Sequence, residues 1–225
     1  MWVVERAVFN RLRNRLQRLY GEENLPRLLS RFELLVGRYG VGQCPDEHCA
    51  DNHWNQKDAV LITYGDMVSR DGEPPLRTLQ SFVDKHLRDA VSAVHVLPFS
   101  PSSSDDGFSV IDYRQVDPAL GAWEQIQSLG GAYRLMVDLV INHVSAESAW
   151  FRAYSNGVAP ERHFFIEVEP GTDLSDVTRP RTHPLLRSVQ TPSGERFVWA
   201  TFSHDQIDLN FSNPDVLFEI MDVLL

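Results

Sequence analysis

AVLITYGD (59–66), AVHVLPF (93–99) and YRLMVDLVINH (133–143) are three short apolar runs of this sequence. Between them, residues 76–91 and 123–131 place apolar side chains at the three- and four-residue steps that are typical of helices. Short apolar runs that alternate with helical segments predict βα units and a parallel sheet. We therefore expect three strands, each of which runs toward a polar loop.

The segments before these runs have a different character. Residues 3–20 and 25–38 have the apolar spacing of amphipathic helices, with arginines between the apolar positions. Residues 40–56 are polar and rich in Pro, Asp, Asn and His, a composition that is typical of a linker. The sequence therefore predicts a helical N-terminal extension over residues 1–55.

The alternation of strand and helix patterns fails after residue 144. Residues 145–210 have little periodicity at first and hold many Pro, Gly, Asp and Arg, which predicts an inserted subdomain after the third strand. Asn213 and Pro214 then provide an N-cap and a first helical residue. The expected division is thus an extension (1–55), three βα units (56–144), the insertion (145–210) and the start of a further barrel helix (211–225).

Charge and composition exclude several classes of partner. The 225 residues are 43% hydrophobic and carry a formal net charge of −10, which argues against nucleic acid, since phosphate binding needs clustered Lys and Arg. No stretch approaches the roughly 20 apolar residues of a membrane span. With only two cysteines and no signal-peptide pattern, the expected location is the cytoplasm.

The two cysteines raise the question of a metal. Cys44 and Cys49 lie close to His48 and His53, and these residue types suit tetrahedral zinc. The spacing C-x₄-C with an adjacent His matches no usual zinc finger, so free cysteines in a polar linker are the favoured interpretation. We expect no metal.

Polar residues at the ends of the apolar runs are the candidates for function, because ligands of parallel barrels bind at the carboxyl ends of the strands. In the third run, alternation would direct Asp138 and Asn142 to one face, with His143 at the mouth of the strand. A charged Asp in an apolar strand needs hydrogen bonds, which neighbouring loops are expected to supply. The alternative interpretation is a core histidine and a turn-forming asparagine.

Two further clusters have both a functional and an ordinary interpretation. SSSDDGFSVIDY (102–113) would ordinarily be an Asp-Gly turn, yet Asp105 or Asp106 could accept sugar hydroxyls while Phe108 offers a flat apolar face. Arg179-Pro-Arg181 would ordinarily be solvated, but its stiffened guanidinium groups also suit a phosphate or carboxylate.

In order along the chain, these segments resemble the α-amylase superfamily, glycoside hydrolase family thirteen, and its sucrose phosphorylase-like subfamily. Within it, SSDDGFSVIDY and TRPR are most similar to the glucosylglycerate phosphorylase branch, which also has a helical N-terminal extension. The segments that carry the resemblance are residues 61–66, 94–113, 135–143, 177–186 and VWATFSHDQIDLN (198–210).

The resemblance implies the fold and the role of each site residue. The fold would be α/β, a partial (β/α)₈ TIM barrel. His143 would bind the 6-hydroxyl of the transferred glucosyl unit, and Asp105 would hold the 4-hydroxyl with Phe108 as its aromatic companion. Asp138 and Asn142 would support the site. The residues implied on the acceptor or phosphate side are Arg181, Phe202 and Gln206.

The resemblance also implies a reaction. In the family, the nucleophilic Asp and the acid/base Glu lie on the fourth and fifth strands, so they are expected beyond Leu225, with no catalytic residue and no turnover in this chain alone. The intact enzyme would convert an α-glucoside, sucrose or glucosylglycerate, and inorganic phosphate into α-glucose 1-phosphate. No cofactor and no calcium are expected.

Other interpretations stay open. A family-thirteen hydrolase or transglucosylase would use water or sugar in place of phosphate. A non-catalytic sugar-binding remnant is the alternative from another class, because the fold alone does not fix a function. The mixed arginine and apolar faces of the extension also suit a homodimer interface.

Overall fold

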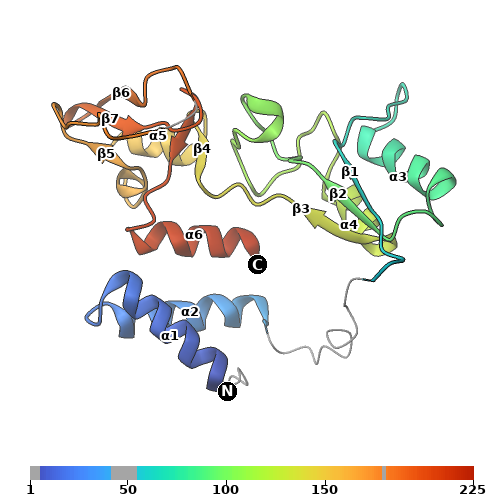
Figure 1. Cartoon of the computed structure of the whole chain (residues 1–225), viewed down its shortest axis with the longest axis horizontal. Coiled ribbons are helices and arrows are strands. Elements are labelled where there is room, and N and C mark those ends of the chain that lie inside the picture. The colour runs from blue at the N-terminus through green and yellow to red at the C-terminus, as the bar shows by residue number, and fades with distance from the viewer. Residues whose placement is uncertain (1–5, 42–54, 179–180) are drawn as a thin grey trace. The chain divides into compact units, whose positions relative to one another are not determined.

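The computed structural model describes residues 6–41, 55–178 and 181–225 (Figure 1). The chain divides into two compact units. One unit comprises Met1–His53 together with Asn210–Leu225, and the other comprises Trp54–Leu209. Cys44, Cys49, His48 and His53, the residues with the side-chain types of a zinc site, lie outside the described residues.

A three-stranded parallel sheet opens the Trp54–Leu209 unit (Figure 1). Its strands are β1 (Val60–Thr63), β2 (Ala93–Val96) and β3 (Arg134–Val137), in the order β1-β2-β3. Both neighbouring pairs are parallel and in register. The predicted parallel sheet of βα units is therefore confirmed.

Helices α3 (Pro75–His86) and α4 (Trp123–Ala132) pack on this sheet. In α3, a proline begins the helix, and the apolar side chains that follow recur at helical spacing. Together with β2 and the loops, the two helices bury one core, whose members include Leu76, Leu79, Val83, Val94, Val96, Ile126 and Leu129. Apolar packing of this kind fixes the strand ends from which the polar loops depart.

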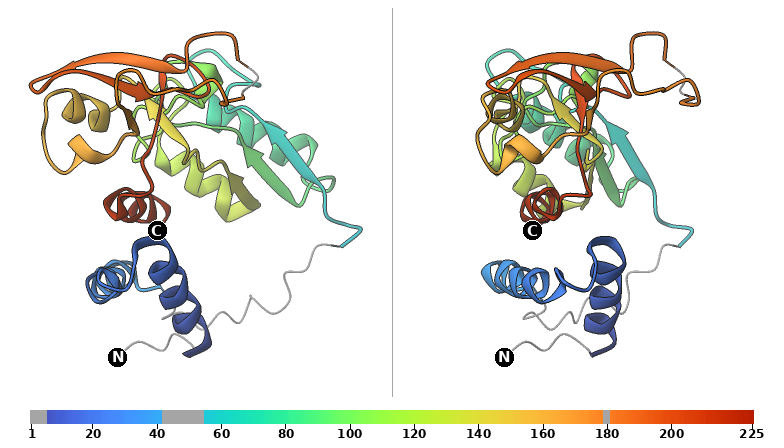
Figure 2. Two further views of the ribbon diagram at one scale, coloured as in Figure 1. Left: turned by 60° about the vertical axis from the view of Figure 1, so that its left-hand side comes forward. Right: turned by 90° about the vertical axis from the view of Figure 1, so that its left-hand side faces the viewer.

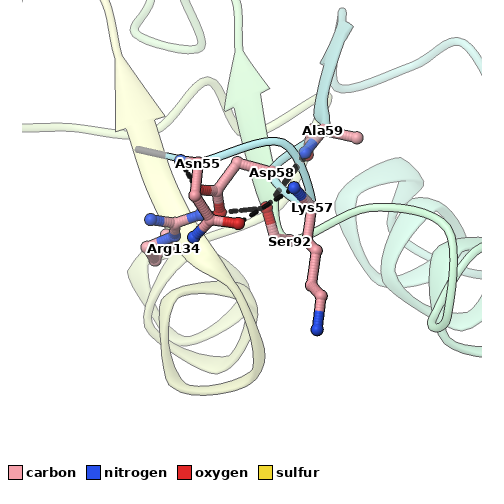
Figure 3. A network of polar contacts seen from close by, with 6 residues as sticks. All are labelled: Asn55, Lys57, Asp58, Ala59, Ser92 and Arg134. Atoms are coloured by element: carbon pink, nitrogen blue, oxygen red, sulfur yellow. Dashed lines mark hydrogen bonds and ion pairs between the residues drawn. The ribbon is translucent and has the colours of Figure 1, made fainter. Parts of the chain in front are cut away.

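A polar network joins the amino-terminal ends of the three strands (Figure 3). The Asp58 carboxylate accepts hydrogen bonds from the Asn55 backbone amide at 2.8 Å and from the Ser92 hydroxyl at 3.0 Å. It also forms an ion pair with Arg134 at the start of β3, and the Arg134 guanidinium donates to Ser92 as well. These contacts lie at the opposite end of the sheet from the polar loops, where side chains contribute to stability.

The sequence predicted a single strand over the third apolar run, but the structure divides this run. β3 ends at Val137, and His143 begins a separate strand, β4 (His143–Ser145). Between them, the carbonyl of Val140 accepts a hydrogen bond from the Tyr113 hydroxyl, and the carbonyl of Asn142 accepts one from the Leu209 amide. The prediction that alternation places Asp138 and Asn142 on one strand face is wrong, because these tertiary contacts draw the chain out of the sheet.

β4 pairs antiparallel with β8 (Gln206–Asp208), so that His143 lies opposite Asp208 and Ser145 opposite Gln206. The segment between them contains helix α5 (Ala149–Ser155), a 3₁₀ turn (Glu161–His163) and a second sheet. That sheet has the order β5-β7-β6, with strands β5 (Glu167–Val168), β6 (Leu186–Thr191) and β7 (Gly194–Trp199). Figure 2 shows β6 and β7 as a long hairpin, drawn in orange.

In its described residues, the other unit contains three helices, α1 (Arg6–Tyr20), α2 (Leu25–Tyr39) and α6 (Pro214–Leu224). All three were predicted, and α6 begins as expected, because the Asn213 side chain accepts a hydrogen bond from the Asp215 amide and Pro214 follows it. The sequence did not predict that α6 packs with α1 and α2. Their common core contains Leu16, Leu25, Leu28, Leu35 and Phe218, and Arg31 of α2 pairs with Asp215 of α6.

In the part of the chain that the structure describes, no helix is long and apolar enough to cross a membrane. The four-part division of the chain into extension, βα units, insertion and further helix stays a prediction.

Candidate functional site

A short turn of unusual backbone geometry carries Asp105. The 3₁₀ turn Asp105–Gly107 has positive φ angles at all three residues, 58° at Asp105, 49° at Asp106 and 98° at Gly107. A positive φ is common for glycine but unfavourable for other residues. A Cβ on Gly107 would lie 2.7 Å from the Pro98 carbonyl oxygen, so only glycine fits there. The turn leaves the Asp105 side chain exposed.

Gln206 connects this turn to β8. Its amide nitrogen donates to Oδ2 of Asp105 at 2.8 Å and lies 3.5 Å from the carbonyl oxygen of Phe108. The Gln206 side chain is almost completely buried, so its polar atoms need partners, and the turn supplies them. The contact fixes one oxygen of Asp105.

His143 meets the same turn from β4. Its Nε2 lies 3.1 Å from the Phe108 carbonyl oxygen, which can only accept, so Nε2 carries the hydrogen. Burial lowers the pKa of His143, and this effect outweighs the Phe108 carbonyl and the Asp105 charge, which both raise it. The imidazole is therefore neutral at pH 7, and its Nδ1 can accept from the Asn142 side-chain nitrogen 3.4 Å away.

Aromatic and cationic side chains border His143. The Phe202 ring lies 5.0 Å from the His143 ring, centroid to centroid, and 40% of its residue surface is exposed. The guanidinium carbon of Arg181 lies 6.0 Å from the centre of the Phe202 ring, at the outer limit of a cation–π contact. An exposed cation thus stands beside a partly exposed ring at the rim of the site.

All six residues that the sequence selected for binding therefore form one continuous set of contacts. The set runs from Asp105 through Gln206, the Phe108 carbonyl and His143 to Phe202 and Arg181. Phe108 contributes its carbonyl oxygen to these contacts, and Phe202 provides the ring beside His143. The role of the Phe108 ring as aromatic companion of Asp105 stays a prediction. Whether the six bind a ligand stays a prediction.

The two supporting residues occupy different places. Asn142, which is exposed, donates from its side-chain amide to Oδ1 of Asp208, 3.2 Å away. The Thr201 hydroxyl also donates to Asp208, whose pKa burial raises and these hydrogen bonds partly lower again. Asp138 instead bonds to Nε2 of His95 on β2 at 2.8 Å. The prediction that loops supply the partners of Asp138 is wrong, because β2 places His95 directly beside the end of β3.

Sequence reasoning missed Asp205 and Tyr113. Asp205 accepts hydrogen bonds from three serine hydroxyls of the 103–109 loop, and Tyr113 donates to the carbonyls of Val140 and His143. Asp205 immediately precedes Gln206, and Ser103, Ser104 and Ser109 surround the Asp-Asp-Gly turn, but only the fold brings them together.

The arrangement can bind a polyhydroxylated ligand. The exposed carboxylate of Asp105 offers acceptor oxygens for hydroxyl groups, and the partly exposed ring of Phe202 offers a flat apolar face. Among the described residues, no group of three or more His, Cys, Asp or Glu side chains could hold a metal ion.

Comparisons with known proteins give the family of the chain. The family described as alpha amylase, catalytic domain, matches residues 86–225. A glucosylglycerate phosphorylase from Allomeiothermus silvanus is 51% identical over 207 residues, which are 92% of this chain and 36% of that protein. A sucrose phosphorylase from Streptococcus mutans is 32% identical over 162 residues, 67% of this chain and 33% of that protein.

A solved structure is similar as well. The crystal structure of sucrose 6F-phosphate phosphorylase from Thermoanaerobacter thermosaccharolyticum aligns with a TM-score of 0.67 and 27% identity, and covers 76% of this chain and 37% of that one. The chain thus spans about a third of the length of the relatives it matches.

Proposed function

Since this chain belongs to the α-amylase family, we propose that it forms the glucosyl-binding side of a retaining α-glucoside phosphorylase. The sheet β1-β2-β3 with α3 and α4 is part of that family's (β/α)₈ barrel. The observation that carries the proposal is the set of contacts that joins Asp105, Gln206 and His143 through the Phe108 carbonyl. The similar proteins named above, which are phosphorylases, support phosphate as the acceptor.

In the proposed reaction, this chain binds the sugar that is transferred. Asp105 accepts a hydrogen bond from the 4-hydroxyl of a terminal glucosyl unit, and His143 contacts its 6-hydroxyl. Because His143 is neutral and its Nε2 hydrogen points to Phe108, the imidazole is held in one orientation. Fixed donors and acceptors of this kind lower the cost of orienting a substrate.

Phe202, Gln206 and Arg181 are proposed to face the acceptor. Gln206 has a double role, because its amide also fixes Asp105. The Arg181 guanidinium carries a permanent positive charge that suits phosphate. The retaining reaction forms a covalent glucosyl intermediate on an Asp, and phosphate then releases α-glucose 1-phosphate. The carboxyl groups that break the bond are not among the residues assigned here.

Glucosylglycerate and sucrose are the proposed substrates, and glucosylglycerate is favoured by the 51% identity with a glucosylglycerate phosphorylase over nearly the whole chain. The proposal includes a cytoplasmic location, which the low cysteine content favours. We also propose, as a minor part of this function, that the arginine-rich helix α1 forms a homodimer interface. No cofactor takes part in the proposed chemistry.

The test is a product assay with the full-length protein. Glucosylglycerate or sucrose is incubated with and without inorganic phosphate, and α-glucose 1-phosphate is measured. The expected result is formation of this product only when phosphate is present. Turnover that does not depend on phosphate would indicate a hydrolase or transglucosylase. Calorimetric binding of either glucoside without turnover would indicate a sugar-binding protein.

A further inference from the structure

One carboxylate collects an unusual number of hydroxyl groups next to the candidate site. Oδ2 of Asp205 accepts hydrogen bonds from Ser103, from Ser104 at 2.7 Å and from Ser109 at 2.7 Å. Ser103 also shares a hydrogen bond with the buried Ser145 of β4. Asp205, which directly precedes β8, thus joins the two ends of one loop, and Ser103 connects that loop to β4.

The loop held in this way is the one with the unfavourable backbone. Ser103 and Ser104 precede the positive-φ residues Asp105 and Asp106, and Ser109 follows them. Consecutive non-glycine residues in this conformation persist only where surrounding contacts determine them. The backbone hydrogen bonds from Ser103 to Ser109 and from Ser109 to Ser104 close the loop, but they lie within it. Asp205 adds three hydrogen bonds from outside the loop.

Asp205 can do this because it remains ionised. Burial would raise its pKa, but the hydrogen bonds from the three serines and the nearby charge of Arg187 lower it below the ordinary value. Hydrogen bonds to an ionised acceptor are about twice as strong as those between neutral groups. The carboxylate is therefore a strong common acceptor for the loop.

The consequence for the site is geometric. Asp205 is bonded covalently to Gln206, whose side chain contacts Asp105 on the tip of the same loop. The loop is thus attached to this segment at its base, through the serines, and at its tip, through Asp105. Loss of the contacts with Asp205 would leave the loop held by Gln206 and His143 near its tip and by the Ser103–Ser145 hydrogen bond at its base.

From this geometry, we infer that Asp205 is a positioning residue, which holds the serine-flanked loop so that Asp105 faces Gln206 and His143. The inference deepens the proposed function and rests on it for its catalytic consequence. Its structural part stands on the contacts of Ser103, Ser104 and Ser109 alone.

Two measurements on Asp205→Asn test the inference separately. The first is hydrogen–deuterium exchange of the 225-residue chain. The amides of Ser103, Phe108 and Ser109, which are hydrogen-bonded within the loop, are expected to exchange at least about tenfold faster, since a charge-assisted hydrogen bond is lost. The Leu97 amide, bonded to Thr63 in the sheet, is expected to keep its rate. Unchanged loop exchange would overturn the inference.

The second measurement is steady-state kinetics of the full-length protein. Asp205→Asn is expected to raise KM for the glucoside about tenfold or more while kcat falls less, because binding geometry rather than a reacting group is disturbed. Asp89→Asn, an exposed aspartate after α3, is the matched control and is expected to behave as wild type. Wild-type kinetics in Asp205→Asn would overturn the catalytic part of the inference.

The outcomes distinguish this inference from the proposed function. If the full-length wild-type protein shows no turnover, the proposed function fails. Hydrogen–deuterium exchange of the loop amides still decides whether Asp205 holds the loop. If Asp205→Asn accelerates exchange throughout the sheet as well, the milder Ser104→Ala variant decides instead. That variant removes one donor from an exposed position, and it is expected to accelerate loop exchange alone. Unchanged exchange in Ser104→Ala would then overturn the inference.

Discussion

The side-chain amide of Gln206 donates to Oδ2 of Asp105 at 2.8 Å, although the two residues are 101 positions apart in the chain. Gln206 is almost fully buried and Asp105 is exposed. The hydrogen bond therefore holds a surface carboxylate in place through a residue of the protein interior. This relationship makes the candidate site a defined structure instead of a set of separate loops.

Removal of the Gln206 amide is expected to weaken the site. In Gln206→Ala, Asp105 loses a donor to its carboxylate, a hydrogen bond worth about 1.5–3 kcal/mol. The value of kcat/KM for the glucoside in the full-length protein is expected to fall about 10- to 100-fold. Gln190→Ala, on the exposed side of β6, is the matched control. A Gln206→Ala enzyme within about twofold of wild type, the range of ordinary surface substitutions, would contradict the assignment.

His143 is expected to make stability depend on pH. Its pKa is lowered in the folded chain from the ordinary value of 6.5, mainly by burial, so the unfolded chain binds the proton more readily. The contribution of His143 is therefore fully present above pH 6.5 and is lost as the pH falls below that value toward the folded pKa. His143→Gln should show a smaller loss of unfolding free energy between pH 7.5 and 5.5, measured by urea denaturation. Equal losses in both proteins would refute this expectation.

The network around Asp58 (Figure 3) is expected to stabilise the amino-terminal ends of the strands. Only 10% of the Asp58 side-chain surface is exposed, and it accepts from Asn55, Ser92 and Arg134. Asp58→Asn removes the charge and one acceptor, so the free energy of unfolding should fall by about 1–3 kcal/mol. The exposed Asp71→Asn serves as control and should change it by less than about 0.5 kcal/mol. Equal effects of the two substitutions would show that the network adds little.

Substitutions at Gly107 and Gly72 distinguish the effect of a steric clash from the effect of backbone strain. Gly107 and Gly72 both have positive φ, 98° and 77°, but only at Gly107 would a Cβ meet another atom, the Pro98 carbonyl oxygen. Gly72→Ala is expected to cost about 1–2 kcal/mol for the conformation alone. Gly107→Ala should cost more in thermal denaturation and should also weaken glucoside binding, because the turn that carries Asp105 must move. A Gly107→Ala variant no less stable than Gly72→Ala would mean that the loop adapts freely.

The sequence by itself determined the local elements and the identity of the candidate site. Periodicity along the chain predicted the sheet β1-β2-β3, the helices beside it and the capped start of α6, because each depends on residues within a few positions of one another. The resemblance of short motifs selected His143, Asp105 and Gln206, which the fold brings into contact.

The β6–β7 hairpin was not predicted, although the sequence contains a local signal for it. Thr191 and Gly194 pair across a two-residue turn, and the Pro192–Ser193 pair followed by glycine is a local signal for such a turn. The many prolines and charges of the segment obscure this signal.

Only the tertiary structure decided where the third strand stops and what holds the site. The run from 133 to 143 is apolar throughout, so its pattern favours a single strand, yet contacts of Tyr113 and Leu209 with its backbone end β3 at Val137. The hydrogen bonds of Asp205 to three serines join residues about one hundred positions apart. Contacts at such separations leave no periodic trace in the sequence, because they depend on the path of the chain through space.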